Sequence, residues 1–394
     1  MDIEFSHRSL GLKASEIREL LKLTQRPEVI SFAGGLPAPE LFPIEKINLI
    51  TTKVLNEQGR QALQYSTTEG YNPLREIIVK ERMNKSGVKT AIQNILIVNG
   101  SQQALDFSAK LFVNKGDIII CESPSYLGAL NAFKAYEPTF LEISMDDDGM
   151  NMDELEEALK NHNNVKMIYT IPDFQNPSGK TMSVERRKRI AELSSKYKIP
   201  VIEDSPYGEL IFEGSPYPCI KSFDKDGYVI TLGTFSKTFC PGLRLGWICA
   251  HEEILKKYIL LKQGSDLQSN TLTQMIAAKF MQEYSLDEHI EKIISVYKKR
   301  RDIMLDSMEK YFPKEVTFTY PKGGLFTWVN LREDIDSIDV NVQALKQNVA
   351  FVPGASFYPN GGNLNHFRLN YSNMNEERIL EGIKRLGNVI KQYY

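Results

Sequence analysis

The sequence predicts an α/β protein, with a large lobe built on a mostly parallel sheet and a smaller α+β lobe after it. Two observations lead to this fold class. In the middle of the chain, short β-rich runs alternate with amphipathic helical stretches, which is typical of repeated strand–helix units. Beyond about residue 285 the pattern changes to a long helical stretch, then strands, then a final helix. The 394 residues are enough for two or three structural units.

The predicted elements follow the chain in order. In the large lobe we expect strands at Ile95–Val98, Asp117–Cys121, Val165–Ile171, Pro200–Glu203, Tyr228–Leu232 and Leu245–Cys249. Between them we expect helices at Gln102–Phe112, Ser125–Ala135, Met152–Lys160 and Ser183–Lys198. The small lobe is expected to hold strands at Val316–Tyr320, Phe326–Asn330 and Phe367–Asn370. The charge run at Glu185–Arg189 is predicted to be the solvated face of its helix.

Composition and charge exclude several classes of protein. Lys and Arg number 48 against 50 Asp and Glu, a net charge of −2, which argues against nucleic-acid or anionic-membrane partners. No apolar run approaches the about 18 to 20 residues of a membrane span, and the N-terminus lacks a secretory signal pattern. We therefore expect a cytoplasmic protein without a membrane partner. The 4 Cys and 5 His residues show no metal-ligand spacing, so neither a disulfide nor a bound metal is expected.

Polar side chains follow five of the predicted strands, at the point where each strand ends. In open α/β sheets, ligands bind outside the carboxyl ends of the strands, so these segments are expected to lie close together. They are Gly100-Ser101-Gln102, Ser123-Pro124-Ser125-Tyr126, Gln175-Asn176-Pro177, Asp204-Ser205-Pro206-Tyr207 and Thr234-Phe235-Ser236-Lys237.

An anion site is predicted where the run Asn99–Gln103 leaves a strand and opens a helix. Free backbone N–H groups and the positive end of the helix dipole favour a phosphate there. Arg244 can add a two-pronged contact to phosphate, and the hydroxyls of Ser236 and Thr234 are nearby. By itself the run is more typical of an ordinary strand–turn–helix junction with Ser101 as the helix cap.

Lys237 comes directly after a buried-looking strand, where a low dielectric would lower its pKa and free the amine for imine formation. A lone lysine is usually a surface charge, so this interpretation depends on its neighbours. Asp204 ends another strand and can hold a protonated heterocyclic nitrogen. Asn176 and Tyr207 can donate hydrogen bonds to a phenolate oxygen, and Tyr126 can stack on a flat ring. Together with a phosphate site, these groups describe a pyridoxal phosphate site.

Six ordered segments resemble the fold-type-I pyridoxal phosphate enzymes of the class I/II aminotransferase group. They are NGSQQALD, SPSYLGA, PDFQNPSG, EDSPYGEL, TFSKTFCPGLRLGW and HFRLNYS. Two further segments, SEIRELLKLTQRPEVISFAGGLPAPELFP and LQYSTTEGYNPLR, are most similar to 2-aminoadipate and kynurenine aminotransferases. The resemblance implies a seven-stranded sheet sandwiched by helices in a large domain, 46–285. It also implies a small C-terminal domain, 286–394, and an N-terminal segment, 1–45, that packs on the small domain and the active site.

The resemblance also implies the roles of the site residues. Lys237 would bind the cofactor covalently and move the proton between substrate and cofactor. Asp204 would keep the pyridine nitrogen protonated, Asn176 and Tyr207 would bind the ring oxygen, and Tyr126 would stack on the ring. The phosphate would be held by Gly100, Ser101, Gln102, Thr234, Ser236 and Arg244, with Tyr65 reaching over from a neighbouring subunit. The chain is therefore expected to form a homodimer with shared active sites.

Three residues are implied in substrate binding besides Asn176. Arg368 would bind the α-carboxylate through a two-pronged ion pair. Gly35 would let the N-terminal segment close over the substrate, because it has no side chain. Arg18 would meet a distal carboxylate, although a solvated helical arginine is an equal alternative.

The predicted function is transfer of an amino group from an L-amino acid to a 2-oxo acid such as 2-oxoglutarate, in two half-reactions with ping-pong kinetics. The expected donors are 2-aminoadipate, glutamate and aromatic or other apolar amino acids. A C–S lyase or a decarboxylase on the same scaffold is an alternative, since the fold does not determine which bond breaks. A non-enzymatic sensor domain of a transcription regulator is a remote alternative.

Overall fold

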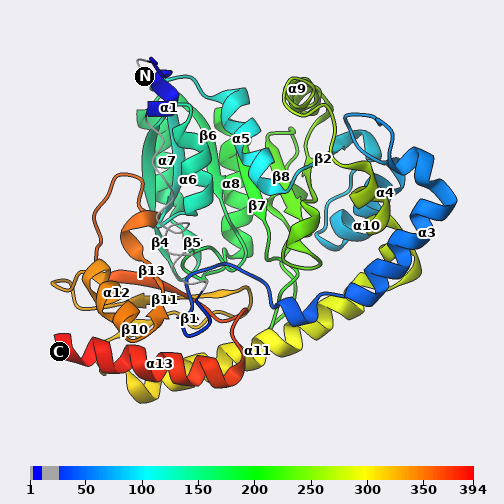
Figure 1. The fold of residues 1–394 in the computed structure, drawn as a ribbon. Helices are drawn as coiled ribbons and strands as arrows, with labels where there is room; N and C mark the ends of the chain where they lie inside the picture. The colour runs from blue at the N-terminus through cyan, green and yellow to red at the C-terminus, as the bar shows by residue number, and fades with distance from the viewer. Residues whose placement is uncertain (1–2, 11–25) are drawn as a thin grey trace.

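A mixed sheet forms the centre of the larger part of the molecule (Figure 1). The structure is a computed structural model and describes residues 3–10 and 26–394. The strands are β2 (Ile95–Val98), β3 (Ile118–Ser123), β4 (Thr139–Asp146), β5 (Gly149–Met150), β6 (Val165–Thr170), β7 (Val201–Ser205), β8 (Val229–Thr234) and β9 (Gly246–Cys249). Across the sheet they follow the order β2-β9-β8-β7-β6-β3-β4-β5. The strands from β8 to β4 run parallel, whereas β9 is antiparallel to both of its neighbours and β5 is antiparallel to β4.

The predicted α/β fold class is confirmed, and the sheet has one strand more than the expected seven. The extra strand is β5, which has only two residues. All six strands expected from the β-rich runs are present. The strand β4 was not expected from its sequence, because its apolar residues are interrupted by Thr, Glu, Ser and Asp, and only some of its positions are buried.

Helices cover both faces of this sheet. They are α3 (Ile44–Ala62), α4 (Asn72–Ile77), α5 (Ser101–Phe112), α6 (Leu127–Lys134), α7 (Met152–Asn161), α8 (Val184–Tyr197), α9 (Glu252–Gln263) and α10 (Thr271–Glu283); a short helix, α1, spans His7–Leu10. Successive residues of β3 belong to different cores: Ile119 packs in the larger core with α5 and α6, and Ile120 packs with α7 and α8. This alternation is expected for a strand buried on both sides.

The prediction that Glu185–Arg189 forms a solvated helix face is wrong at Arg187. This side chain is fully buried in α8 and forms an ion pair of 2.6 Å with Asp173. It also donates hydrogen bonds to the carbonyls of Pro172 and Met182. A buried guanidinium is tolerated because these oxygens satisfy its donors. Arg187 therefore holds the segment that follows β6.

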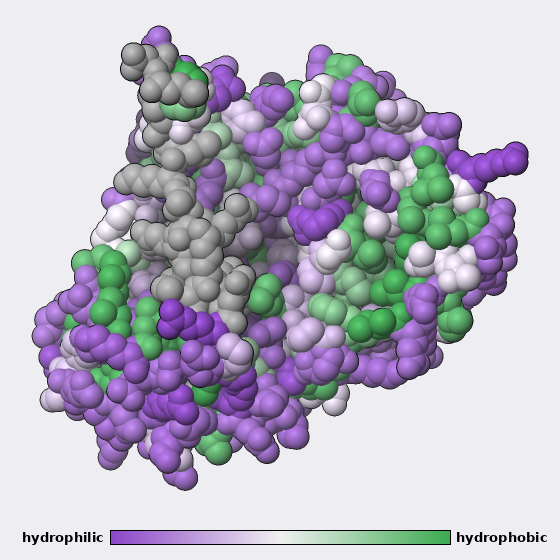
Figure 2. Space-filling view, viewed as in Figure 1, coloured by the Kyte–Doolittle hydropathy of each residue, from purple (hydrophilic) through white to green (hydrophobic). Residues whose placement is uncertain are grey.

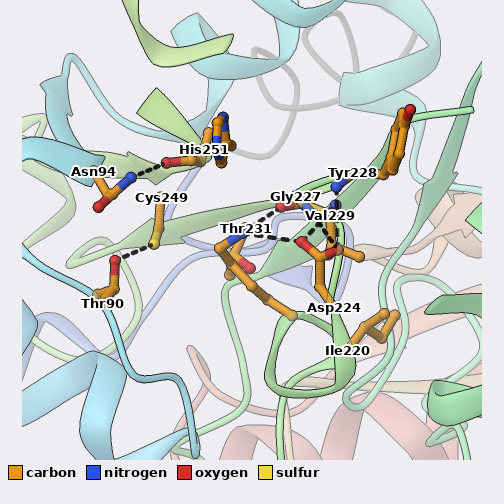
Figure 3. A network of polar contacts seen from close by, with 12 residues as sticks. Thr90, Asn94, Ile220, Asp224, Gly227, Tyr228, Val229, Thr231, Cys249 and His251 are labelled. Atoms are coloured by element: carbon orange, nitrogen blue, oxygen red, sulfur yellow. Dashed lines mark hydrogen bonds and ion pairs between the residues drawn. The ribbon is translucent and has the colours of Figure 1, made fainter. Parts of the chain in front are cut away.

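A turn closed by Asp224 determines where β8 begins (Figure 3). Its carboxylate accepts hydrogen bonds from the backbone N–H groups of Gly227 at 2.9 Å, Tyr228 at 3.1 Å and Val229 at 3.0 Å. Such local side-chain contacts stabilise the turn before the strand starts. The opposite end of β8, at Thr234, is thereby placed at the carboxyl edge of the sheet.

A second, antiparallel sheet lies at the other end of the molecule (Figure 1). Its strands occur in the order β10 (Thr317–Phe318), β11 (Phe326–Asn330), β14 (His366–Asn370) and β13 (Val352–Pro353). Beside it β1 (Ile30–Ser31) pairs in parallel with β12 (Val349–Ala350), so residues from near the N-terminus join this part of the fold. The remaining helices are α11 (Leu286–Tyr311), α12 (Ser337–Lys346) and α13 (Glu376–Ile390).

The long helix α11 connects the two parts of the molecule and packs along α13 (Figure 1). Near its start, Asp287 forms an ion pair with Arg82 of the larger part at 3.0 Å. Further along, Arg301 donates to the carbonyl of Pro321, just before β11. In the described ranges, 3–10 and 26–394, no helix has the length and apolar character needed to cross a membrane.

Candidate active site

The carboxyl ends of neighbouring parallel strands bring the predicted site residues together. Asp204 lies near the end of β7, paired in register with Leu232 of β8. Lys237 follows the end of β8 by three residues, and Asn176 follows β6 by six. Arg368 reaches the same site from the small sheet, in β14. The site therefore lies where the two parts of the molecule meet.

The amine of Lys237 is held by a backbone oxygen. Its Nζ donates a hydrogen bond of 2.7 Å to the carbonyl of Gly35, which brings the N-terminal part of the chain onto the site. Burial of the amine and the positive charges of Arg368 and Arg244 together lower the pKa of Lys237 to about 8, and the charge of Asp204 opposes this shift. A substantial fraction of the amine is therefore neutral, and nucleophilic, near pH 8.

Asp204 is a buried carboxylate with one oxygen available. Its Oδ2 accepts a hydrogen bond of 3.0 Å from the hydroxyl of Tyr169, a neighbour on β6. Its Oδ1 is buried and has no hydrogen-bond partner among the described residues. Burial raises the pKa of Asp204 to about 7, against the hydrogen bond from Tyr169 and the charge of Lys237. A cationic N–H donor facing Oδ1 would stabilise the ionised form.

A cradle for an anion lies at the start of α5. Gly100 has a φ of +76°, and a Cβ built on it would come within 2.5 Å of Nη2 of Arg244, so a side chain would displace the guanidinium. Arg244 itself donates to the carbonyl of Asn99 at 3.2 Å. A Cβ on Gly246 would lie 3.0 Å from the backbone nitrogen of Ser101, so this strand packs directly under the first turn of the helix.

Two hydroxyls and one amide complete the surroundings of this cradle. Thr234 Oγ1 donates to Ser236 Oγ at 3.0 Å, and it accepts from the backbone N–H of Ser236 at 3.1 Å. The side chain of Gln102 donates to the carbonyl of Gly128 at 2.9 Å, which joins α5 to the start of α6. The predicted phosphate-binding residues are therefore neighbours in space, although they come from separate segments.

Arg368, Asn176 and Tyr207 form a buried chain of hydrogen bonds. Arg368 Nη1 donates to Asn176 Oδ1 at 2.7 Å, and Asn176 Nδ2 donates to the Tyr207 hydroxyl at 3.3 Å. The other terminal nitrogen of Arg368 donates to the carbonyl of Ala33 at 2.7 Å. Burial lowers the pKa of Arg368 to about 10, so the guanidinium is still charged at pH 7. The guanidinium carbon Cζ of Arg368 lies 4.1 Å from the centre of the Phe326 ring.

Tyr126 lies within the electrostatic range of the same groups. Burial raises the pKa of its hydroxyl, the charge of Asp204 raises it further, and the charges of Arg368 and Arg244 oppose this. Gly128 gives the ring room, because a Cβ there would come within 2.4 Å of it.

Two predicted residues are not part of this group in the described chain. Tyr65 is 80% exposed and stands outside the buried cluster. Arg18 lies outside the described residues, so its contact with a distal carboxylate stays a prediction.

Sequence reasoning missed three contributors to the site. The carbonyls of Ala33 and Gly35 hold Arg368 and Lys237, and the Tyr169 hydroxyl holds Asp204. A backbone carbonyl carries no signal in the sequence. The position of Tyr169 in a strand next to that of Asp204 is a signal that could have been used.

The comparisons with known proteins agree with this geometry. The sequence model of the family "Aminotransferase class I and II" matches residues 41–386. The chain belongs to this family. It is 49% identical over 392 residues to aromatic-amino-acid aminotransferase 1 of Thermococcus litoralis, which covers 98% of this chain and 94% of the relative. The predicted resemblance to class I/II aminotransferases is thereby confirmed, and the protein is a transaminase.

Two solved structures of aminotransferases are closely similar to this one. Kynurenine aminotransferase of Pyrococcus horikoshii, in complex with PMP, superposes with a TM-score of 0.94 at 45% identity and covers 99% of this chain and 97% of its own. Alpha-aminoadipate aminotransferase of Thermus thermophilus, complexed with N-(5'-phosphopyridoxyl)-L-leucine, superposes with a TM-score of 0.91 at 40% identity. This match covers 98% of this chain and 97% of the Thermus chain. The predicted cofactor, pyridoxal phosphate, is confirmed for this aminotransferase.

The residues of the site fit this cofactor. The free Oδ1 of Asp204 is an acceptor for a ring N–H, the cradle at Gly100 can take a phosphate beside Arg244, and the Lys237 amine has a lowered pKa. When bound, pyridoxal phosphate supplies an electron sink for the bond broken at the substrate Cα. With a pKa of about 8, the Lys237 amine would be able to accept and return a proton there near pH 8.

The rate at which the cofactor-free aminotransferase attaches pyridoxal phosphate is expected to rise about tenfold from pH 7 to 9 and then to level off. A pKa of about 8 makes the neutral Lys237 amine the minor form at pH 7 and the major form at pH 9. An ordinary lysine would instead give a rise of about a hundredfold over this range without levelling. Stopped-flow absorbance of the mixed protein and cofactor measures this, and such a continued rise would contradict the lowered pKa.

Proposed function

We propose that this aminotransferase moves the amino group of 2-aminoadipate, glutamate, and aromatic or other apolar L-amino acids to a 2-oxo acid such as 2-oxoglutarate, by a ping-pong mechanism. The observation that carries the proposal is the arrangement of Arg368. It is a buried, charged guanidinium whose Nε has no partner among the described residues, and it lies against the rings of Phe326 and Phe357. A carboxylate is the ligand such a group binds best.

The roles of the other residues belong to the same proposal. Asn176 orients Arg368 and, with Tyr207, donates toward the ring oxygen of the cofactor. Asp204 holds the ring nitrogen, and Lys237 moves the proton at the substrate Cα. The proposed donors are supported by two relatives: the one from Thermococcus is named for aromatic amino acids, and the one from Thermus is named for alpha-aminoadipate.

The test is the visible absorption of the cofactor-loaded protein with amino donor and no acceptor. L-glutamate, L-2-aminoadipate and L-phenylalanine are each expected to convert the cofactor to pyridoxamine phosphate, and 2-oxoglutarate is expected to restore the original spectrum. Initial rates at several fixed acceptor concentrations should give parallel double-reciprocal lines. A protein that converts none of these donors would contradict the proposal. Release of pyruvate and ammonia, or of CO₂, would indicate the lyase or decarboxylase alternative.

The proposal includes a homodimer with shared active sites. Figure 2 shows apolar side chains gathered over α3, on the right of the molecule. Four large apolar residues are exposed here: Ile44, Leu49 and Leu55 of α3, and Leu63, which directly follows this helix. An apolar patch of this kind on a folded chain is typical of a surface that another chain covers. Tyr65 lies two residues beyond this patch and is free to reach a partner.

Mixing two impaired variants is expected to restore activity if Tyr65 serves the neighbouring site. Tyr65→Ala should weaken cofactor binding about ten- to a hundredfold, through loss of a hydrogen bond to the charged phosphate. In a mixed dimer with a Lys237→Ala subunit, one site has both defects and the other has none, so about half of the parent activity per dimer should return. The measurement is activity of the purified, differently tagged mixed dimer. Activity no higher than that of the Tyr65→Ala homodimer would contradict shared sites.

A further inference from the structure

Glu122, at the carboxyl end of β3, is a buried carboxylate that the proposed reaction does not use. It accepts hydrogen bonds from Thr170 Oγ1 at 2.5 Å, from Gln175 Nε2 at 3.1 Å and from the backbone N–H of Ile171 at 3.2 Å. All three partners are donors, and the residue is 1% exposed. An acidic side chain in such a place would be destabilising without these partners, so its position is closely determined by them.

The Gln175 side chain extends this contact to two loops of the active site. Besides donating to Glu122, its Nε2 donates to the carbonyl of Pro124 at 2.8 Å. Its Oε1 accepts from the backbone N–H of Ser178 at 2.9 Å and from the Ser178 hydroxyl at 2.6 Å. Gln175 is fully buried. Its amide therefore fixes the loop after β3 against the loop after β6.

These two loops carry groups on which the proposed site depends. Pro124 comes two residues before Tyr126, and Gln175 comes directly before Asn176. The first loop also contacts the small sheet region, since the backbone N–H of Ser125 donates to the carbonyl of Phe357 at 2.9 Å. A chain of hydrogen bonds that begins at Glu122 thus joins the loop that carries Tyr126 to the loop that carries Asn176.

We propose that Glu122 is a positioning residue, which holds Tyr126 and Asn176 at their working separation through Gln175. This inference rests on the proposed function, because it concerns how the same site is held in place. A site needs its groups within about half an ångström of the productive geometry. The cofactor ring and the substrate carboxylate both depend on this spacing, so loosening it should affect carboxylate binding as well as rate.

The pKa of Glu122 agrees with a tightly held group. Burial raises it to about 7, while the hydrogen bonds from Thr170, Ile171 and Gln175 oppose the rise. A glutamine at this place can keep the same contacts, because its oxygen can accept from Ile171 and Gln175 while its NH₂ group donates to the threonine hydroxyl. The Glu122→Gln variant therefore separates the position of the group from its charge.

Glu203 provides a matched control. It is also a fully buried carboxylate, in the middle of β7, and it accepts three hydrogen bonds: from Thr231 Oγ1 at 2.7 Å and from the backbone N–H groups of Ile220 at 2.6 Å and Lys221 at 3.2 Å. Its partners belong to β8 and to a short 3-10 helix, Ile220–Phe223, and none of them lies in the loop after β3 or in the loop after β6. Glu203→Ala removes a carboxylate of the same burial and bonding without loosening Gln175.

The experiment compares Glu122→Ala, Glu122→Gln and Glu203→Ala in the cofactor-loaded protein. The dissociation constant of 3-phenylpropionate, an unreactive carboxylate, is measured from the change in cofactor absorption, alongside kcat, KM and Tm. Glu122→Ala is expected to raise the dissociation constant and KM about ten- to a hundredfold, because it removes the acceptor of the Thr170 hydroxyl, of the Ile171 N–H and of one of the two contacts of the Gln175 amide. Glu122→Gln should stay within about threefold of the parent. Glu203→Ala should lower Tm and leave the dissociation constant within about twofold.

Two results would overturn the inference. One is a Glu122→Ala protein whose dissociation constant changes no more than that of Glu203→Ala. The other is a Glu122→Gln protein as impaired as Glu122→Ala. Should Glu122→Ala not fold, Gln175→Met breaks the same link from the other side and is expected to give the same shift. The carboxylate titration requires only bound cofactor, so a parent protein that binds 3-phenylpropionate and converts no donor contradicts the proposed function alone.

Discussion

Lys237→Ala is expected to lower kcat for transamination by about 10⁴-fold, the upper end of what a positioned acid–base group contributes. The structure gives the reason, since the Lys237 amine has its pKa lowered to about 8 and is subject to the charges of Arg368, Arg244 and Asp204. The positive charge of Lys237 also lowers the pKa of Asp204, so the two groups act on each other. Single-turnover absorbance with L-glutamate measures the loss.

The control for this variant is Lys221→Ala. Lys221 lies at the opposite end of β8, where its Nζ donates to the carbonyl of Val229 at 2.7 Å. Removing it should change Tm and leave kcat within about threefold. A Lys237→Ala enzyme that retained a tenth or more of the parent rate would show that another group moves the proton.

Asp204→Asn is expected to lower kcat by about 10²- to 10³-fold, the effect of losing one preorganised electrostatic contact. The amide keeps the shape of the side chain and removes its charge, so a protonated ring nitrogen loses its counter-ion. Tyr169→Phe is the companion variant, because it removes only the 3.0 Å hydrogen bond to Oδ2. A loss of about tenfold or less is expected from it.

The pH dependence distinguishes these two variants. The Tyr169 hydroxyl favours the ionised form of Asp204, so its removal should raise the pKa of that carboxyl. The charged form is present above the pKa and is lost as the pH falls through it. The acidic limb of the kcat profile should therefore move to higher pH in Tyr169→Phe and should flatten in Asp204→Asn. Profiles that coincide with the parent profile in both variants would contradict the assigned role of Asp204.

Much of the site was predictable because parallel strands place their carboxyl ends at one edge. The positions of Lys237, Asp204 and Asn176 follow from this rule once the strands are assigned, and the structure brings them to one place. Their roles stay predictions until the variants are measured. Arg368 comes from the small sheet, and only the resemblance to aminotransferases connected it with the rest.

The features that could not be predicted are those that depend on distant parts of the chain. The carbonyl of Gly35 lies 202 residues from Lys237, and that of Ala33 lies 335 residues from Arg368. Neither leaves a local pattern. Arg187 was wrongly predicted to lie on a solvated face for a related reason. Helical periodicity assigns charged residues to a polar face and carries no information about a distant acidic partner such as Asp173.

The position of Asn176 between two groups has a consequence for how the enzyme selects its substrates. One amide accepts from Arg368 and donates to Tyr207, so it cannot rotate without affecting both. In the proposed site, one neighbour faces the carboxylate and the other faces the cofactor. Any change that favours one orientation of the amide affects both Arg368 and Tyr207. Thermodynamic reciprocity requires the coupling free energy between binding at the two sides to be the same in each direction. In the proposed site, the affinities for the carboxylate and for the cofactor would thereby be coupled through Asn176, so a mutation that reorients this amide is expected to change both.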